Sequence, residues 1–455
     1  MPGIIGDAAL KRAFSCLEPF PSAVLAVSGG PDSMALMYLA RRWAALTDRS
    51  LASFAVVTID HKLRPESRDE AEFVAEQALA LGVTHVTIEW TADKPKTGIQ
   101  AAARQARYDL MIEHCRSRAF DCIVTAHTED DQAETFLMRL RRGSGVDGLA
   151  AMAAVSDRGG VAIVRPLLGF SKSRLAAYLR ASSIPFVRDP SNENRAFERV
   201  RLRHAMKALA SAGVTRSSMA MAALRLGRSR DALADIAGGF LARHFQVTPL
   251  AQGMIGLELF DALPDDLAVR VLAQVLALIG GEQDAPRLMR VERLLASLKA
   301  GRREATLGGC VVIAAAGTLN FYREPGRLKI APLTFESGAS RLWDGRFILT
   351  FMHTNGGGFS VRQLGADGWL AYRKAMKESR QAASPNRLAA ITTPALWKGS
   401  CLICAPALGF FDAGAGEGHA RPLVAALAPS LARFLTRISN ETASMLGKDT
   451  PIPYL

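Results

Sequence analysis

The N-terminal part of the chain alternates short apolar runs with longer stretches of helical periodicity. Short apolar runs bounded by turn residues are typical of buried strands, and apolar residues three and four apart are typical of helices. We predict strands at 24–27, 54–60, 86–90, 122–126 and 161–164, with helices at 34–46, 67–81, 100–118 and 129–142. This alternation predicts an α/β fold, a parallel sheet with helices on both faces that binds ligands at the carboxyl ends of its strands.

The pattern changes near residue 198, where Ala-, Leu- and Arg-rich helical periodicity replaces the strand signals. Helices are predicted at 219–241, 265–279 and 285–299. From about residue 305, short β-like runs at 310–315, 347–351 and 402–411 are separated by glycine turns, and a last helix is predicted at 425–446. We therefore expect an α/β domain at 1–212, a helical domain at 213–303 and a smaller β-rich α+β domain at 304–455.

One turn carries the strongest chemical signal. After the strand at 24–27 the chain reads Ser-Gly-Gly-Pro-Asp-Ser, and a helix follows. A strand that enters a helix through glycines exposes backbone N–H groups at the positive end of the helix dipole, which favours phosphate. Gly29 and Gly30 let the backbone approach an anion closely. No lysine follows them, so the turn differs from the Gly-Lys-Ser/Thr loop of common nucleotide triphosphatases.

A cluster of acids follows the strand predicted at 122–126. His127 lies at the strand end, and Asp130, Asp131 and Glu134 share a face of the next helix. The helix dipole favours acids at this end by about 0.3–1 kcal/mol each, which explains one or two of them. Three consecutive acids, a fourth nearby and a histidine exceed that need. We predict a polar pocket for a cation, a metal or a proton-transfer step.

Other polar residues are less specific. Asp60, His61 and Arg64 follow the second strand, where an ordinary polar loop and a nucleotide contact are both consistent with the sequence. Three basic groups are candidates for RNA contact, although a solvated helix face explains the first equally well and, from the residues alone, explains the last better. They are Arg104 with Arg107, the alternating Arg199, Arg201 and Arg203, and Arg287 with Arg290 and Arg293.

The net charge of +13 favours a polyanionic partner, usually nucleic acid, although an alkaline bias in the whole proteome of the source explains it equally well. No apolar run is long enough to cross a bilayer and the first residues lack a signal-peptide core, so we expect a cytoplasmic protein without membrane contact. Cys401 and Cys404 have metal-like spacing, but their apolar surroundings predict a buried strand.

In their order and spacing these segments resemble the tRNA(Ile)-lysidine synthetases of the PP-loop, or N-type ATP pyrophosphatase, superfamily. The acidic helix and the Asp-Pro-Ser-Asn motif are the specific elements, since the glycine turn marks only the superfamily. The matching motifs are Ser-Gly-Gly-x-Asp-Ser from 28, Asp-His-x-Leu-Arg from 60, Ala-Arg-x-x-Arg-Tyr from 103, His-x-x-Asp-Asp-Gln-x-Glu-Thr from 127, Arg-Gly-Ser-Gly from 142, Arg-Pro-Leu-Leu from 165 and Asp-Pro-Ser-Asn from 189.

The resemblance implies a HUP-like PP-loop domain that joins free L-lysine to carbon 2 of the wobble cytidine of tRNA(Ile) with a CAU anticodon. It implies ATP as a substrate together with Mg²⁺, an adenylated cytidine as the intermediate, and AMP and pyrophosphate as products. The partners implied are tRNA(Ile) and lysine, and a homodimer is one expected state.

The resemblance also implies residue roles. The ATP-binding residues would be Ser28, Gly29, Gly30, Pro31, Asp32, Ser33, Asp60, His61, Arg64 and His127. The catalytic residues would be Asp131, Glu134 and Arg203, the lysine-binding residues Asp130, Asp131 and Glu134, and the candidate Mg²⁺ ligand Asp32. The tRNA-binding residues would be Arg104, Arg107, Arg199, Arg201, Arg287 and Arg290.

Other interpretations stay open at this point. A PP-loop enzyme that thiolates cytidine would need cysteine pairs, and no Cys-x-x-Cys occurs in 1–212. An ammonia-fed amide ligase would normally need a glutaminase, of which no pattern is evident. A non-catalytic tRNA-binding protein derived from an enzyme is opposed by the intact Asp32, His127, Asp131 and Glu134.

Overall fold

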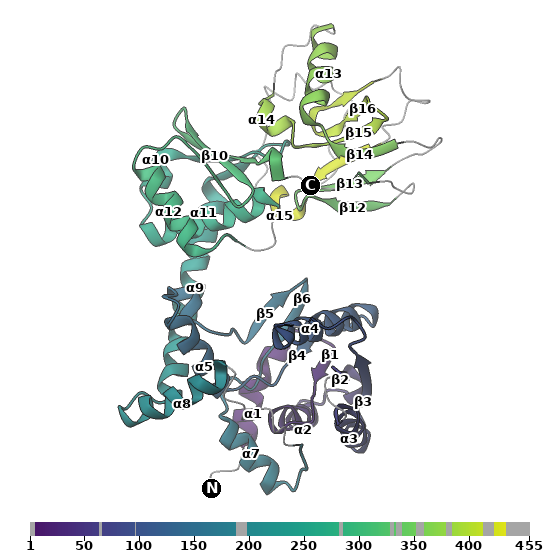
Figure 1. Cartoon of the computed structure of the whole chain (residues 1–455), viewed down its shortest axis with the longest axis vertical. Helices are drawn as coiled ribbons and strands as arrows, with labels where there is room; N and C mark the ends of the chain where they lie inside the picture. The colour runs from purple at the N-terminus through teal and green to yellow at the C-terminus, as the bar shows by residue number, and fades with distance from the viewer. Residues whose placement is uncertain are drawn as a thin grey trace. The chain divides into compact units, whose positions relative to one another are not determined.

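The computed structural model describes residues 5–62, 66–95, 97–187, 198–281, 285–327, 332–333, 339–351, 359–378, 385–412 and 423–433, without some side chains in 198–207. The chain forms two compact units, Met1–Asp231 and Ala232–Leu455 (Figure 1). Their boundary falls inside one long helix, α9 (Arg216–His244). The expected three-domain division stays a prediction.

The first unit is built on a six-stranded sheet in the order β3-β2-β1-β4-β6-β5 (Figure 1). Its strands are β1 (Ala23–Ala26), β2 (Phe54–Asp60), β3 (Thr84–Glu89), β4 (Cys122–Val124), β5 (Val155–Arg158) and β6 (Val161–Val164). The first four and β6 run parallel and confirm the predicted strands, while β5 pairs antiparallel with β6. The hydrophobic pattern misses β5 because its residues, Val-Ser-Asp-Arg, form a partly exposed edge strand. Gly159 and Gly160, both at positive φ, close this hairpin.

Helices cover both faces of this sheet, because alternate residues of each strand point to opposite sides. Leu25 and Val56 pack with α1, α2, α3 and α7, whereas their neighbours Val24 and Val57 pack with α4. The helices are α1 (Asp7–Phe14), α2 (Pro31–Leu46), α3 (Ser67–Ala80), α4 (Ile99–Ser117) and α7 (Lys172–Ala181). Two further elements, α5 (Glu129–Leu140) and α6 (Val146–Leu149), follow β4, and α5 packs on α8 (Glu198–Ser211) through Ala133 and Met206.

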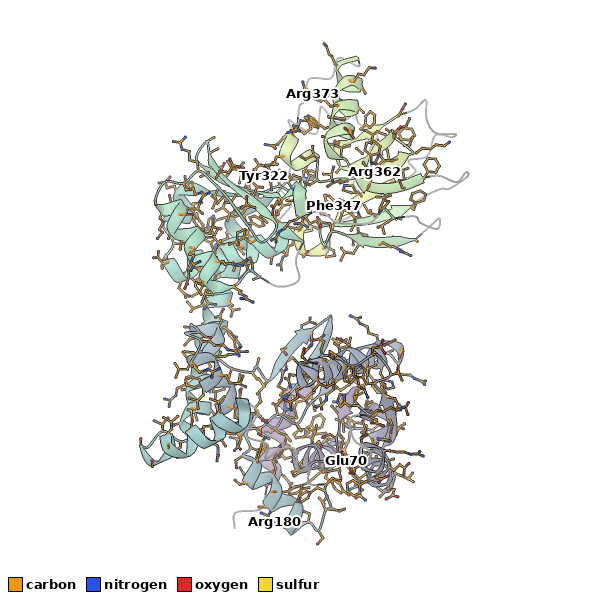
Figure 2. The ribbon with its side chains drawn as sticks, viewed as in Figure 1. Glu70, Arg180, Tyr322, Phe347, Arg362 and Arg373 are labelled. Carbon is orange, nitrogen blue, oxygen red and sulfur yellow. The ribbon has the colours of Figure 1, made fainter. Side chains whose placement is uncertain are left out.

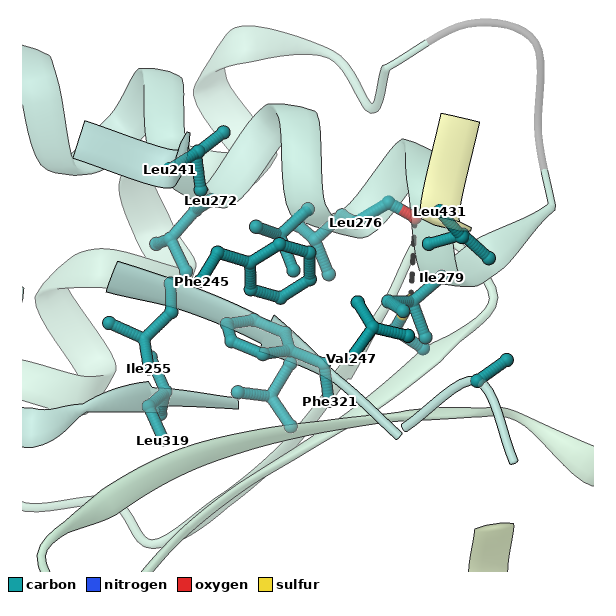
Figure 3. Packing of buried hydrophobic residues seen from close by; sticks show 14 of the residues in the cluster. Leu241, Phe245, Val247, Ile255, Leu272, Leu276, Ile279, Leu319, Phe321 and Leu431 are labelled. Carbon is teal, nitrogen blue, oxygen red and sulfur yellow. Dashed lines mark hydrogen bonds between the residues drawn. The ribbon is translucent and has the colours of Figure 1, made fainter. Parts of the chain in front are cut away.

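The second unit has a five-stranded sheet in the order β7-β8-β11-β10-β9. Phe245 and Phe321 from this sheet share one buried cluster with Leu272 and Leu276 of α11 (Figure 3). The strands β7 and β8 come from 213–303, and β8 pairs antiparallel with β11 from 304–455, so one sheet spans the expected boundary at 303. The elements are β7 (Phe245–Val247), β8 (Gly253–Gly256), α10 (Leu257–Asp261), α11 (Asp265–Gly280), α12 (Leu288–Lys299), β9 (Glu304–Leu307), β10 (Cys310–Ala315) and β11 (Thr318–Arg323).

Two smaller sheets complete this unit, β12-β13-β18 and β14-β15-β16-β17. The start of the helix predicted at 425–446 is wrong, because β18 (Leu423–Leu427) pairs antiparallel with β13 and buries Leu423. Residues 429–432 are helical, and the rest of the predicted helix, from 434, lies outside the described residues. An alanine-rich sequence allows either structure, and the partner strand decides between them. The other elements are β12 (Ser340–Trp343), β13 (Phe347–Phe351), β14 (Phe359–Gln363), α13 (Gly365–Glu378), α14 (Arg387–Ala390), β15 (Pro394–Lys398), β16 (Cys401–Ala405), β17 (Phe410–Phe411) and α15 (Pro429–Ala432).

The cysteine pair lies on a strand, as predicted. Cys401 is exposed and Cys404 is buried, since residues three apart on β16 face opposite sides of the sheet. Across the ranges that the structure describes, no helix combines the length and apolar character that a membrane span requires.

Candidate active site at the carboxyl ends of the parallel strands

The glycine turn joins β1 to α2 with an open helix N-terminus. Gly29 has a φ of +80°, a left-handed conformation that L side chains rarely adopt. A Cβ there would lie 3.5 Å from Val74, and 3.8 Å from the backbone carbonyl of Glu70, which is labelled on the first unit in Figure 2. Gly30 is the N-cap residue, and no described side chain caps α2. The first N–H groups of α2 are therefore left for an anion.

The two serines of the turn hold its shape. The backbone N–H of Ser28 donates to Ser33 Oγ at 3.1 Å, and Ser33 Oγ donates to the carbonyl of Gly30 at 2.9 Å. The Ser28 and Ser33 hydroxyl oxygens lie 3.3 Å apart. Ser33 thus closes the turn from inside, so that the backbone amides rather than this hydroxyl are the main groups offered to a ligand.

The N-terminus of α5 is closed by its own residues. Thr128 is the N-cap, and it forms a capping box with Asp131. The Thr128 N–H and hydroxyl donate to Asp131 Oδ2 at 2.9 and 2.8 Å, and the Asp131 N–H donates to Thr128 Oγ1 at 3.4 Å. Capping thus explains part of the acid cluster, as the sequence alone allowed. It does not explain Glu134, which is only 3% exposed although it lies beyond the first turn.

Lys172 connects the two helix N-termini, and the sequence analysis did not single it out. Its Nζ lies 3.0 Å from Asp131 Oδ1 and 3.6 Å from Asp32 Oδ2, in the first turn of α2. Lys172 is the first residue of α7, where the helix dipole disfavours a cation. The acids must therefore hold it. The only signal in the sequence was a lysine that follows the Arg-Pro-Leu-Leu motif at a helix start.

The pKa values of the two aspartates around Lys172 are shifted in opposite directions. Burial, aided by the charge of Asp131, raises the pKa of Asp32 to about 6 despite Lys172. Burial would also raise the pKa of Asp131, but Lys172 and the hydrogen bonds from Thr128 hold it below its ordinary value. Burial opposes the charge of Lys172, yet Asp131, Asp32 and Glu134 together raise its pKa. Lys172 and Asp131 therefore form a charged pair at neutral pH.

Asp130 contacts the backbone of Lys172 and the side chain of Arg216. Its Oδ2 accepts the backbone N–H of Lys172 at 2.8 Å, and its Oδ1 lies 3.4 Å from Nε of Arg216. Both oxygens are thus used to fasten α5 to α7 and to the start of α9. This arrangement gives Asp130 a structural task in addition to the expected lysine contact, which stays a prediction.

The expected nucleotide contacts lie at neighbouring strand ends. Asp60 Oδ1 accepts the Lys62 N–H and the Ser67 hydroxyl, each at 2.7 Å, and these bonds lower its pKa although burial opposes them. His127 Nδ1 lies 2.8 Å from the hydroxyl of Thr125 at the end of β4. These contacts orient both side chains at the carboxyl edge of the sheet.

His61 contacts Arg107, one of the expected RNA-binding arginines. Burial and Arg107 lower the pKa of His61 to about 4, so its ring is neutral at physiological pH. Its Nε2 lies 3.4 Å from Arg107 Nη2, and Arg104 lies over the ring of Tyr108. The structure therefore gathers part of this basic group beside the nucleotide edge.

For several expected residues a place at this site stays a prediction. Arg64 and the Asp-Pro-Ser-Asn motif at 189–192 lie outside the described residues, as do the side chains of Arg199, Arg201 and Arg203 on α8. Arg287, the N-cap of α12, and Arg290 are exposed in the second unit.

Asp32 fits the expected role of a magnesium ligand. Its Oδ1 is buried and has no hydrogen-bond partner among the residues that the structure describes. Those residues hold no cluster of three or more His, Cys, Asp or Glu suited to a metal. Mg²⁺ usually binds one or two carboxylates and takes its other ligands from water and phosphate, so a single free carboxylate oxygen beside a phosphate site is consistent with it.

Comparison with known proteins agrees with this geometry. Residues 8–209 match the family model of the PP-loop domain, which confirms the expected fold of the first unit. The chain is 38% identical over 410 residues to a tRNA(Ile)-lysidine synthase of Ruegeria pomeroyi, covering 90% of this chain and 93% of the relative. It is 42% identical over 343 residues to a tRNA(Ile)-lysidine synthase of Bradyrhizobium diazoefficiens, covering 70% and 94%. The chain belongs to the tRNA(Ile)-lysidine synthase family.

Proposed function

We infer that this protein uses ATP to join free lysine to carbon 2 of the wobble cytidine of tRNA(Ile), as membership of its family indicates. One observation supports this chemistry above the others. An open helix N-terminus suited to phosphate and a cluster of buried acids suited to an amine are linked by a single lysine, Lys172. The reaction needs both sites, whereas thiolation or RNA binding without catalysis has no use for an amine site.

In the first step, the oxygen on carbon 2 of cytosine attacks the α-phosphorus of ATP, a phosphorus–oxygen bond forms and pyrophosphate leaves. Negative charge develops on the phosphates, where the uncapped N–H groups of α2 would stabilise it. Asp60, His61 and His127 are our candidates for holding the nucleotide at the strand ends. Bound Mg²⁺ would supply further phosphate neutralisation, and Asp32 Oδ1 is our candidate ligand.

In the second step, the amine of lysine attacks carbon 2, the bond from that carbon to the AMP oxygen breaks, and AMP leaves. The amine arrives as an ammonium, loses one proton before it can attack, and loses a second once the carbon–nitrogen bond has formed. Asp131 and Glu134, both buried, are our candidates for binding the ammonium and accepting a proton. Arg203 is our candidate for stabilising the departing AMP.

The wobble cytidine must reach this edge as part of a large polyanion. Arg107, beside His61, and Arg104, over the ring of Tyr108, are our candidates for RNA contact near the site, with Arg199 and Arg201. Arg287 and Arg290 are exposed on the second unit and are our candidates for a further tRNA contact. Binding through phosphates should weaken steeply with salt. A cytoplasmic location and a homodimer stay predictions.

The test combines the full chain with ATP, Mg²⁺, radiolabelled lysine and tRNA(Ile) with a CAU anticodon. We expect label in the RNA, with one AMP and one pyrophosphate released per label. A transcript with uridine at the wobble position is the matched control and should take up none. Pyrophosphate release without label would show a different nucleophile and contradict this function.

A further inference from the structure

Lys172 occupies the acid pocket that the proposed function assigns to the amine of the substrate. Its ammonium lies 3.0 Å from Asp131 Oδ1, while the other oxygen of Asp131 is taken up by the capping box with Thr128. A second ammonium against the same carboxylate would lie close to the first, and like charges at such distances repel strongly. The pocket as it stands is therefore occupied by the protein's own cation.

The same ammonium is also within reach of the phosphate site. It lies 3.6 Å from Asp32 Oδ2, in the first turn of α2. The glycine turn lacks the lysine that grips the terminal phosphates in common nucleotide triphosphatases, so a cation for these phosphates must come from another element. Lys172 comes from α7, and its backbone is fixed by the bond from its N–H to Asp130. A flexible four-carbon stem allows the ammonium to move while the backbone stays in place.

We propose that Lys172 is exchanged between the two sites: the phosphates of bound ATP draw its ammonium away from Asp131, and the vacated carboxylate then receives the amine of the incoming lysine. This inference rests on the proposed function, because it assumes that a lysine amine binds at Asp131. It makes Lys172 a positioning residue that couples the two substrates. ATP binding then raises the affinity for lysine, so the amine site opens only when the activating nucleotide is present.

Such coupling is reciprocal: lysine must raise the affinity for the nucleotide by the same factor. The experiment measures the dissociation constant of the full chain for a non-hydrolysable α,β-methylene analogue of ATP with Mg²⁺, with and without saturating lysine. We expect lysine to tighten analogue binding about tenfold, within the usual range of such couplings. Ornithine, one methylene shorter, tests whether the effect depends on the length of the amine.

Three variants separate the exchange from other causes. Lys172→Met removes the charge and should bind the analogue more weakly, with a lysine effect close to onefold. Lys172→Arg keeps the cation and should retain most of the coupling. Lys11→Met changes an exposed lysine on α1 and should behave like the unchanged protein. Thermal unfolding of each variant shows whether it is folded, and Lys172→Arg decides the matter if Lys172→Met is not.

The failure of this inference is distinguishable from the failure of the proposed function. A coupling factor of one in the unchanged protein, or full coupling in Lys172→Met, overturns the exchange even if label still enters tRNA. Loss of coupling in Lys172→Arg with its fold intact also overturns it. If the unchanged protein transfers no label to tRNA, the proposed function is wrong, and the exchange is overturned with it.

Discussion

Two turns in the first unit join a parallel strand to a helix, and they treat the helix N-terminus in opposite ways. The turn before α2 presents glycines and leaves the N–H groups uncapped, whereas the turn before α5 closes them with Thr128 and Asp131. An open N-terminus attracts an anion, and a self-capped one places a carboxylate where it holds a cation. The same local architecture thus yields, at one edge of the sheet, the two sites that we propose for phosphate and for an amine.

The acids at α5 do more than cap the helix. Asp131 serves the cap through one oxygen and holds Lys172 through the other. Asp32, at the corresponding end of α2, has one oxygen near Lys172 and the other buried without a partner in the described ranges. Lys172 connects the two turns, because its ammonium lies near an aspartate of each.

The largest expected effect tests the acid pocket itself. Changing Glu134→Gln keeps the shape of this buried side chain and removes its charge, so lysine transfer should fall about 10²–10⁴-fold, as for loss of a general base. ATP-analogue affinity should stay within about twofold. The measurement is label transfer to tRNA under single-turnover conditions. Glu129→Gln on the same helix is the control, and near-normal transfer in Glu134→Gln would refute its role.

The two aspartates should shift stability with pH in opposite directions. The pKa of Asp32 is raised from 3.8 to about 6, so its ionisation destabilises the nucleotide-free fold as pH rises through this range, by up to about 3 kcal/mol. Asp32→Asn should therefore be more stable than the unchanged protein at pH 7.5 and equal to it near pH 4. The pKa of Asp131 is lowered, so its stabilising effect is present above its ordinary pKa and is lost on acidification.

Asp131→Asn should accordingly be less stable than the unchanged protein at pH 7.5, with the difference shrinking in acid. Urea unfolding from pH 7.5 down to about pH 2.5 measures both variants, because the loss for Asp131 falls below its ordinary pKa. If both substitutions changed the free energy of unfolding in the same direction at pH 7.5, the pKa values of the two aspartates would not be shifted in opposite directions.

Substitutions at the two glycines of the open turn should distinguish backbone strain from an effect on ligand binding. Gly29→Ala forces a side chain into left-handed backbone and should cost about 1–2 kcal/mol of unfolding free energy. Gly30→Ala has an ordinary φ of −70° and open surroundings, so stability should change by less than about 0.5 kcal/mol. Both should weaken binding of the ATP analogue, because the backbone must approach the phosphates. Intact analogue affinity in Gly30→Ala would place the phosphates elsewhere.

The smallest effect concerns the closed turn. Thr128→Ala removes the N-cap and should cost about 1 kcal/mol of unfolding free energy, with little change in analogue affinity. Thr135→Ala is the matched control, since its hydroxyl bonds only to the Asp131 carbonyl within α5. Chemical unfolding of the two variants checks this difference. Equal losses of unfolding free energy would mean that the Thr128 cap stabilises the protein no more than the Thr135 hydroxyl does.

Much of the site was predictable because it depends on local chemistry. The glycine turn, the acid cluster and the strand-end residues Asp60 and His127 follow directly from residue type and from the rule that parallel strands present their carboxyl ends together. The edge strand β5 and the strand β18 were missed, because pairing partners rather than intrinsic preference decide such segments.

The sequence by itself determined the α/β order of the first unit, the phosphate turn and the presence of buried acids, since each depends on contacts between near neighbours along the chain. Only the tertiary structure decided which residue neutralises those acids. Lys172 lies 41 positions from Asp131 along the chain, and the hydrophobic pattern of the sequence does not predict that their side chains lie 3.0 Å apart. Burial and charge pairing depend on which elements pack together, so the electrostatic states of Asp32 and Asp131 exist only in the folded protein.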